Sequence, residues 1–163
     1  MNLVSATALS LLVLSLAPMA SAKGRTVKIA IKSEGIAREV STSDVAQFGI
    51  WEGPGVTINR VEQTEGFIID WSKGIVNTIP AGLQKYEVSF YAEGEPPALS
   101  YIVTYVYDPA TQTGYVYLPG KTDKEVQYNR MWHGHGYEGN WLKATKAWDD
   151  FARPLIQERP RQN

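Results

Sequence analysis

The two histidines of the chain stand two residues apart, as His133 and His135 on either side of Gly134. In an extended segment, residues i and i+2 point to the same side, so both imidazoles can reach one Zn²⁺ or Cu²⁺ ion. A complete site needs a third ligand, and Glu138 is the nearest in the sequence. The alternative is a glycine-rich loop whose histidines are solvated or cap the following helix. The sequence therefore offers His133 and His135 as a candidate metal pair, and it implies no other cofactor.

Acid–base chemistry on glycosides needs two carboxylates on either side of the bond that breaks. Asp70 and Glu87 are the candidates, because both stand in strand-like segments beside aromatic residues, where burial can shift a pKa. The alternative places both on the solvated outer face of a sheet. Cysteine is absent, and so are a Gly-x-Ser-x-Gly elbow and a glycine-rich nucleotide loop. We therefore assign no catalytic residue, and a small extracytoplasmic hydrolase or metal-dependent enzyme remains the alternative function.

Tyrosine is concentrated in the middle of the chain, with seven of the nine lying between residues 86 and 117. An exposed aromatic platform stacks on sugar rings or holds an extended peptide without any net charge. The alternative is structural, because tyrosine suits a sheet and cross-strand aromatic pairs stabilise it. Trp51 precedes a Gly-Pro turn and either joins such a surface or is buried in the core. The candidate ligand-binding residues are Tyr101, Tyr105, Tyr107, Tyr115, Tyr117 and Trp51.

Charge and composition exclude some partners. The 163 residues carry 16 Lys and Arg against 17 Asp and Glu, for a formal net charge of -1. A nucleic-acid binder normally has a clustered basic excess, so we expect no nucleic-acid partner. The length fits one domain with a sizeable core. The expected partner is an unknown small molecule, a glycan or a protein.

The first 22 residues have the layout of a secretory signal peptide. The apolar run Leu9–Leu16 is too short to span a membrane, and the small-residue triplet Ala20-Ser21-Ala22 follows it. Cleavage after Ala22 would release a chain without a membrane span. The absence of cysteine and of glycosylation sequons favours a bacterial periplasmic or secreted protein. We expect a signal peptide over 1–22, one domain over 23–157 and a polar tail over 158–163.

Three segments rich in aromatic and β-branched residues predict consecutive antiparallel strands over 86–91, 99–107 and 115–118. Their connections are too short for parallel crossovers, so the strands form a meander. Alternating apolar residues predict further strands over 26–32 and 66–71.

Two helices complete the expected fold. A short N-terminal helix begins within residues 41–44 and buries Val45 and Phe48. A C-terminal helix runs from Trp141 to about Ala152, and Pro154 ends or kinks it. The predicted class is α+β: an antiparallel, meander- or sandwich-like sheet with the short N-terminal helix and with the C-terminal helix packed on the sheet.

Several strings together resemble a group of small exported bacterial proteins of unknown function. In order they are Trp51-Glu52-Gly53-Pro54-Gly55, Asp70-Trp71-Ser72, Tyr86-Glu87-Val88-Ser89-Phe90-Tyr91, Tyr115-Val116-Tyr117-Leu118-Pro119-Gly120 and Glu138-Gly139-Asn140-Trp141. The resemblance spans most of the chain after residue 22 and implies no activity. The residues themselves favour an exported, non-catalytic binding or interaction module for a saccharide, peptide or protein partner.

Overall fold

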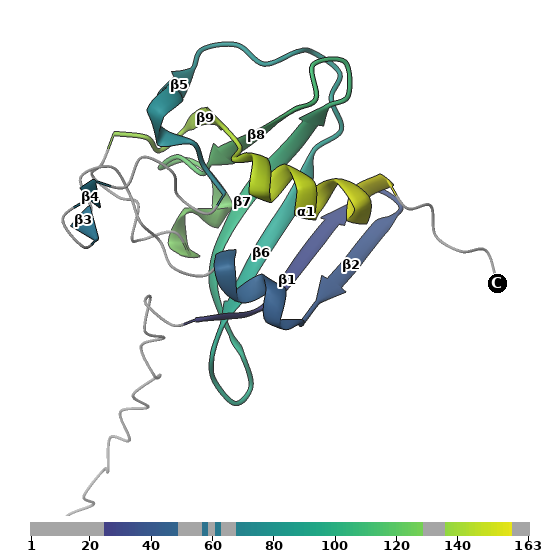
Figure 1. The fold of residues 1–163 in the computed structure, drawn as a ribbon, viewed down its shortest axis with the longest axis vertical. Helices are drawn as coiled ribbons and strands as arrows, with labels where there is room; N and C mark the ends of the chain where they lie inside the picture. Colours follow the sequence, from purple (N-terminus) through teal and green to yellow (C-terminus); the bar gives the residue numbers. More distant parts are fainter. Residues whose placement is uncertain (1–24, 49–56, 59–60, 63–67, 129–135, 158–163) are drawn as a thin grey trace, which may run out of the picture.

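The computed structural model describes residues 25–48, 57–58, 61–62, 68–128 and 136–157. Within them, a seven-stranded antiparallel sheet carries the helix α1 (Lys146–Gln157) across one face (Figure 1). This arrangement confirms the predicted antiparallel sheet with a C-terminal helix. The strands, in their order across the sheet, are β2 (Ile36–Val40), β1 (Thr26–Ser33), β6 (Tyr86–Ala92), β7 (Ala98–Asp108), β8 (Thr113–Leu118), β9 (Asn140–Lys143) and β5 (Ile75–Val76). A separate pair is formed by β3 (Thr57–Ile58) and β4 (Val61–Glu62).

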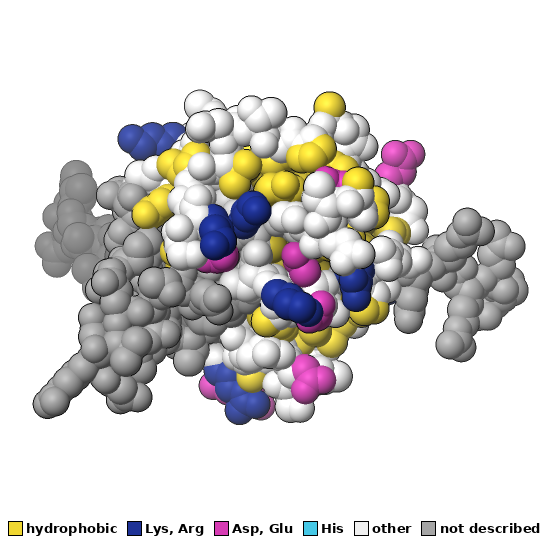
Figure 2. Space-filling view, turned by 45° about the horizontal axis from the view of Figure 1, so that its top comes forward, with side chains coloured by type: hydrophobic (Ala, Val, Ile, Leu, Met, Phe, Trp, Pro, Cys, Tyr) yellow, Lys and Arg dark blue, Asp and Glu magenta, His cyan; other side chains and the backbone are white. Residues whose placement is uncertain are grey.

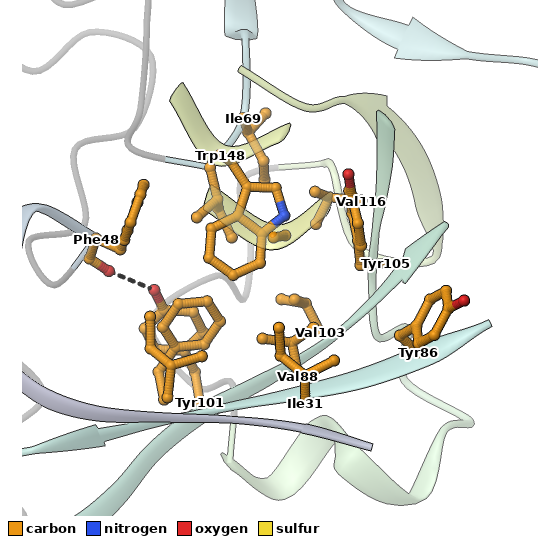
Figure 3. Packing of buried hydrophobic residues seen from close by; sticks show 14 of the residues in the cluster. Ile31, Phe48, Ile69, Tyr86, Val88, Tyr101, Val103, Tyr105, Val116 and Trp148 are labelled. Atoms are coloured by element: carbon orange, nitrogen blue, oxygen red, sulfur yellow. Dashed lines mark hydrogen bonds between the residues drawn. The ribbon is translucent and has the colours of Figure 1, made fainter. Parts of the chain in front are cut away.

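The central strands β6, β7 and β8 are neighbours in an antiparallel meander, as the sequence predicts. Tyr105 of β7 lies opposite Tyr86 of β6 and Val116 of β8. These positions are buried, and together with Val103 they face α1 (Figure 3). Because side chains alternate along a strand, Thr104 of β7 lies on the opposite face.

The short N-terminal helix expected within residues 41–48 is not seen as an α-helix. Ser43–Phe48 instead form a 3₁₀ helix, η1, and the backbone N–H of Val45 donates to the carbonyl of Thr42, three residues back. Helices of this tighter kind occur in short pieces, which fits a segment of one or two turns. Val45 and Phe48 are buried in it.

The C-terminal helix begins later than predicted. Residues 140–143 form the strand β9 beside β8, and they bury Leu142 while its neighbours on the strand stay half-buried. The hydroxyl of Thr145 accepts a 3.2 Å hydrogen bond from the N–H of Trp148, so the helix is capped at Thr145. Pro154 lies inside the helix, not at its end. It falls in the last turns, where losing one backbone hydrogen bond interrupts little of the ladder.

Of the strand predicted over 66–71, the structure describes residues 68–71, and for these the prediction is wrong. Ile69 makes an isolated bridge to Ala144, and the chain then turns into the 3₁₀ helix η2 (Trp71–Lys73). Asp70 ends the extended segment because its side chain accepts a hydrogen bond from the N–H of Ser72 and so caps η2.

The core lies between α1 and the sheet and is centred on Trp148, which is fully buried (Figure 3). Its ring lies 5.1 Å from that of Phe48, 5.6 Å from Phe90 and 5.8 Å from Tyr105, measured between centroids. The indole N–H of Trp148 has no hydrogen-bond partner among the described residues. Trp148 therefore holds α1 on the sheet through packing alone.

The opposite face of the sheet is partly covered by the 3₁₀ helix η3 (Lys124–Tyr128), which contacts β7. Before it, Asp123 accepts a 2.9 Å hydrogen bond from the hydroxyl of Tyr117 in β8. Across the part of the chain that the structure describes, no helix combines the length and apolar character needed to cross a membrane.

Candidate functional site

An open hollow of about 400 Å³ lies where the turn between β7 and β8 approaches α1, β9 and η2. A second hollow, of about 370 Å³, lies toward the C-terminal end of α1. Tyr107, Gln112 and Arg153 line both, so the two are treated as one site and called the β7–β8 hollow. Four basic side chains border it: Lys73, Lys143, Lys146 and Arg153.

The turn at the rim of the hollow is fixed by Asp108. Its two carboxylate oxygens accept hydrogen bonds from the hydroxyl of Thr111 at 2.7 Å and from the N–H of Ala110 at 2.9 Å. These bonds favour the ionised form, so they lower the pKa of Asp108. The turn then places Gln112 at a φ of 53°. That left-handed conformation is costly for a residue other than glycine, and strain of this kind is typical of functional sites.

Asp149, in the first turn of α1, forms the inner wall of the hollow. One carboxylate oxygen accepts a 2.7 Å hydrogen bond from the hydroxyl of Tyr105, and the other a 2.9 Å bond from the N–H of Gly114. Burial disfavours the charged form and raises the pKa of Asp149. Burial, followed by the charge of Asp149, raises the pKa of Tyr105 far above its ordinary value, so its hydroxyl remains a donor.

Gly114 is required for this arrangement. A Cβ atom at this position would stand 1.9 Å from an Asp149 oxygen and 2.7 Å from the Tyr105 ring. Any side chain would therefore displace the carboxylate from its two donors. The Tyr105–Asp149–Gly114 contact ties the sheet to the helix, and this is a structural use of the carboxylate.

The charged side chains of the hollow differ in whether other residues of the protein pair with them. Lys146 pairs with Asp150, and Asp70 accepts hydrogen bonds from Ser72. Within the described ranges, no carboxylate forms an ion pair with Lys73, Lys143 or Arg153. On the face drawn in Figure 2, basic side chains are set among acidic ones.

Arg153 contacts Tyr107, the aromatic residue that borders the hollow. The hydroxyl of Tyr107 is the largest cause of the raised pKa of Arg153. Both residues are half-buried, and they stand next to each other on the wall. The hollow thus presents a ring face beside a guanidinium group.

Two of the predicted platform tyrosines belong to the core. Tyr101 and Tyr105 are 2% and 0% exposed, and Tyr101 stacks on Phe90 with ring centroids 4.2 Å apart. The hydroxyl of Tyr101 donates a 3.0 Å hydrogen bond to the carbonyl of Phe48 (Figure 3). Neither ring can contact a ligand while α1 is in place.

Two other candidates lie on the opposite face of the sheet. Tyr117 is paired with Thr104 and Tyr115 with Val106, so both point away from α1. Tyr115 is buried, and Tyr117 is half-buried. The five tyrosines are therefore split between two faces and three of them are buried, which favours the structural alternative over a single exposed platform. The reason for the split is the register between β7 and β8, which alternation along one strand does not reveal. Tyr107 alone of the five borders the hollow.

The remaining candidates, Trp51, His133 and His135, lie outside the described residues. Glu138, the suggested third metal ligand, accepts a 2.9 Å hydrogen bond from the N–H of Gly136. Among the residues that the structure does describe, no three His, Cys, Asp or Glu side chains are placed to hold a metal ion.

The carboxylates Asp70 and Glu87 do not form a pair. The N–H of Asp70 donates to the carbonyl of Lys143 at 2.9 Å, which places Asp70 beyond β9. Glu87 lies in β6, so four inter-strand spacings of about 4.8 Å, or roughly 19 Å, separate the two positions. The catalytic carboxylates of glycosidases are about 5–10 Å apart, which excludes this pair from that chemistry.

Sequence reasoning missed Lys73, Asp149 and Arg153 as site residues. Asp149 and Arg153 stand four residues apart on the same side of the helix. The sequence feature that could have indicated the Asp149 contact is Gly114, because a glycine at the start of a returning strand marks a close approach of another group.

No protein-family model, curated protein or solved structure matches the chain.

Proposed function

We propose that the protein is an exported, non-catalytic module that binds a saccharide, or a small molecule of similar polarity, in the β7–β8 hollow. The observation that carries the proposal is the hollow itself. It measures about 400 Å³, and the ring of Tyr107 stands on its wall among polar side chains. Ligand sites span about 300–1,000 Å³, so the size suits one or a few sugar rings.

The lining of the hollow favours a polar ligand. Among the described residues on the wall of the larger hollow, every side chain apart from Tyr107 and Ala144 is polar or charged. Burying an apolar ligand there would desolvate these groups without replacing their hydrogen bonds. Sugar hydroxyls both donate and accept, so they can bind Gln112 and Thr113, while the apolar face of a sugar ring packs on Tyr107.

A binding role fits the carboxylates better than catalysis does. Each oxygen of Asp149 accepts a hydrogen bond from the protein, and Asp150 pairs with Lys146. General acid–base catalysis needs a carboxyl group within reach of the substrate proton. The hydrolase alternative would be favoured if the purified protein cleaved any saccharide that it binds.

Export is proposed from the sequence. The apolar run Leu9–Leu16 and the triplet Ala20-Ser21-Ala22 predict cleavage and release into the periplasm or the medium. Mass spectrometry of the protein recovered from each compartment tests this point. We expect an exported chain that begins at Lys23, and an uncleaved chain confined to the cytoplasm would contradict it.

The binding function is tested by calorimetric titration of the purified protein with neutral and acidic oligosaccharides. We expect at least one to bind with a micromolar to millimolar Kd, and we expect Tyr107→Ala to weaken that binding. The matched control is Tyr91→Ala, a half-buried tyrosine of β6 that does not line the hollow. The proposal fails if no saccharide binds, or if Tyr107→Ala and the control bind equally well.

A further inference from the structure

We propose that the ligand of the β7–β8 hollow is acidic: a saccharide of the uronic acid class whose carboxylate is bound by Arg153 together with Lys143 and Lys73. This inference rests on the function proposed above and specifies its ligand. It follows from which charged side chains of the hollow already form ion pairs or hydrogen bonds within the protein.

All three carboxylates that line the hollow have partners in the protein. Asp149 accepts from Tyr105 and Gly114, Asp150 pairs with Lys146, and Asp70 accepts from Ser72. Only Asp150 is paired with a cation; Asp70 and Asp149 accept from neutral donors, so the protein engages their oxygens while their negative charge remains.

Three cations remain. Lys73, Lys143 and Arg153 border the hollow from η2, β9 and α1, and in the described part of the chain none has an ion-pair partner. This local excess of positive charge belongs to a chain whose formal net charge is -1. Against the three carboxylates, the four basic side chains leave this lining with a formal charge of +1, so it attracts an anion more strongly than a neutral ligand.

Arg153 is the main anchor of the proposed site. Its guanidinium group is a planar fork that binds a carboxylate through two parallel hydrogen bonds. Arg153 and Tyr107 line the same wall, which sets a cation beside an aromatic ring. A uronic acid has the matching layout, with a carboxylate attached directly to a ring whose apolar face can pack on tyrosine.

The test compares by calorimetry two probes with the same sugar backbone, tri-galacturonic acid and its fully methyl-esterified form, in which each carboxylate is replaced by a neutral methyl ester. We expect the acid to bind about tenfold more tightly or better, since hydrogen bonds to charged groups are the stronger ones. Added salt should reduce the preference for the acid, because screening weakens exposed charge pairs.

Variants locate the effect. Arg153→Gln should lower affinity for the acid by about tenfold and affinity for the ester much less, while Arg153→Lys retains part of the preference. The matched control is Lys121→Gln, because Lys121 is exposed and lines neither hollow. Lys143→Gln and Lys73→Gln carry the same test if Arg153→Gln fails to fold, as judged by its melting temperature.

The outcomes separate the two proposals. Equal binding of acid and ester overturns the acidic ligand and leaves the saccharide-binding function standing. A preference for the acid that survives all three Gln substitutions overturns the assignment to these residues. If neither probe binds at millimolar concentration, the acidic ligand is overturned. If no neutral saccharide binds either, the binding function is overturned as well.

Discussion

The hydroxyl of Tyr105, in the centre of the sheet, donates a 2.7 Å hydrogen bond to Asp149 in the first turn of α1. The same helix carries Arg153 one turn later, at the wall of the β7–β8 hollow. A buried residue of the sheet therefore fixes the part of the helix that faces the proposed ligand.

Removing this hydroxyl should destabilise the protein. In Tyr105→Phe, a partly buried carboxylate loses one donor, which costs about 1–3 kcal/mol of unfolding free energy. Urea denaturation measures the change. The matched control is Tyr91→Phe, whose ring lies under Lys28 and should retain nearly full stability. Equal stability of the two variants would contradict the role of the Tyr105–Asp149 bond.

Gly114→Ala should disrupt the same contact from the other side. The added Cβ would stand 1.9 Å from an Asp149 oxygen, so the carboxylate must leave its two donors. We expect a loss of about 2 kcal/mol or more, by the same reasoning about an unpaired buried group. In a Tyr105→Phe background the loss should be smaller, because the two changes break one network. Strictly additive losses in this double-mutant cycle would argue against a shared contact.

The raised pKa of Asp149 predicts a pH dependence. The pKa is near 3.9 in the unfolded chain and higher in the fold, because burial disfavours the carboxylate. Between the two values the folded state holds more protons, so the free energy of unfolding decreases as pH rises through that window. Asp149→Asn cannot titrate there. The free energy of unfolding of the wild type, relative to that of Asp149→Asn, should therefore fall as pH rises above about 4. If this difference instead rises with pH, the pKa of Asp149 is lowered in the fold and the account is wrong.

Much of the sheet could be predicted from the sequence, because the dense aromatic and β-branched segments of β6, β7 and β8 alternate regularly. The start of α1 could not. Trp141, Ala144 and Trp148 fit a helical spacing, but Asn140–Lys143 pair with β8 and so form a strand. Tertiary pairing decided between two local patterns that the residues allow equally.

The site was harder to predict than the sheet. Whether tyrosines of two strands share a face depends on the register between β7 and β8, which alternation along a single strand does not give. The hollow itself combines Lys73, Gln112, Lys143 and Arg153, which come from four separate segments. No spacing along the chain brings such residues together, so only the folded structure reveals them.

Gln112 offers a test of strain at the site. Its φ of 53° disfavours most side chains by about 1–2 kcal/mol, and glycine removes that cost while adding chain entropy to the unfolded state. The free energy of unfolding of Gln112→Gly should therefore be close to or above that of the wild type. Its affinity for the saccharide should be lower. Gln112→Asn, which tolerates this conformation and keeps an amide, should retain part of the affinity. Denaturation and calorimetry give the two readings, and a Gly variant that binds normally would exclude Gln112 from recognition.

The most direct test of the proposed site is a nuclear magnetic resonance titration of the labelled protein with tri-galacturonic acid. If the β7–β8 hollow is the binding site, the largest backbone amide shifts will fall on Lys73, Gln112, Thr113, Lys143 and Arg153, which line it. Amides on the opposite face of the sheet, such as those of Tyr117 and Asp123, will move little. Shifts concentrated on that opposite face, or no shifts at saturating probe, would contradict the proposed site.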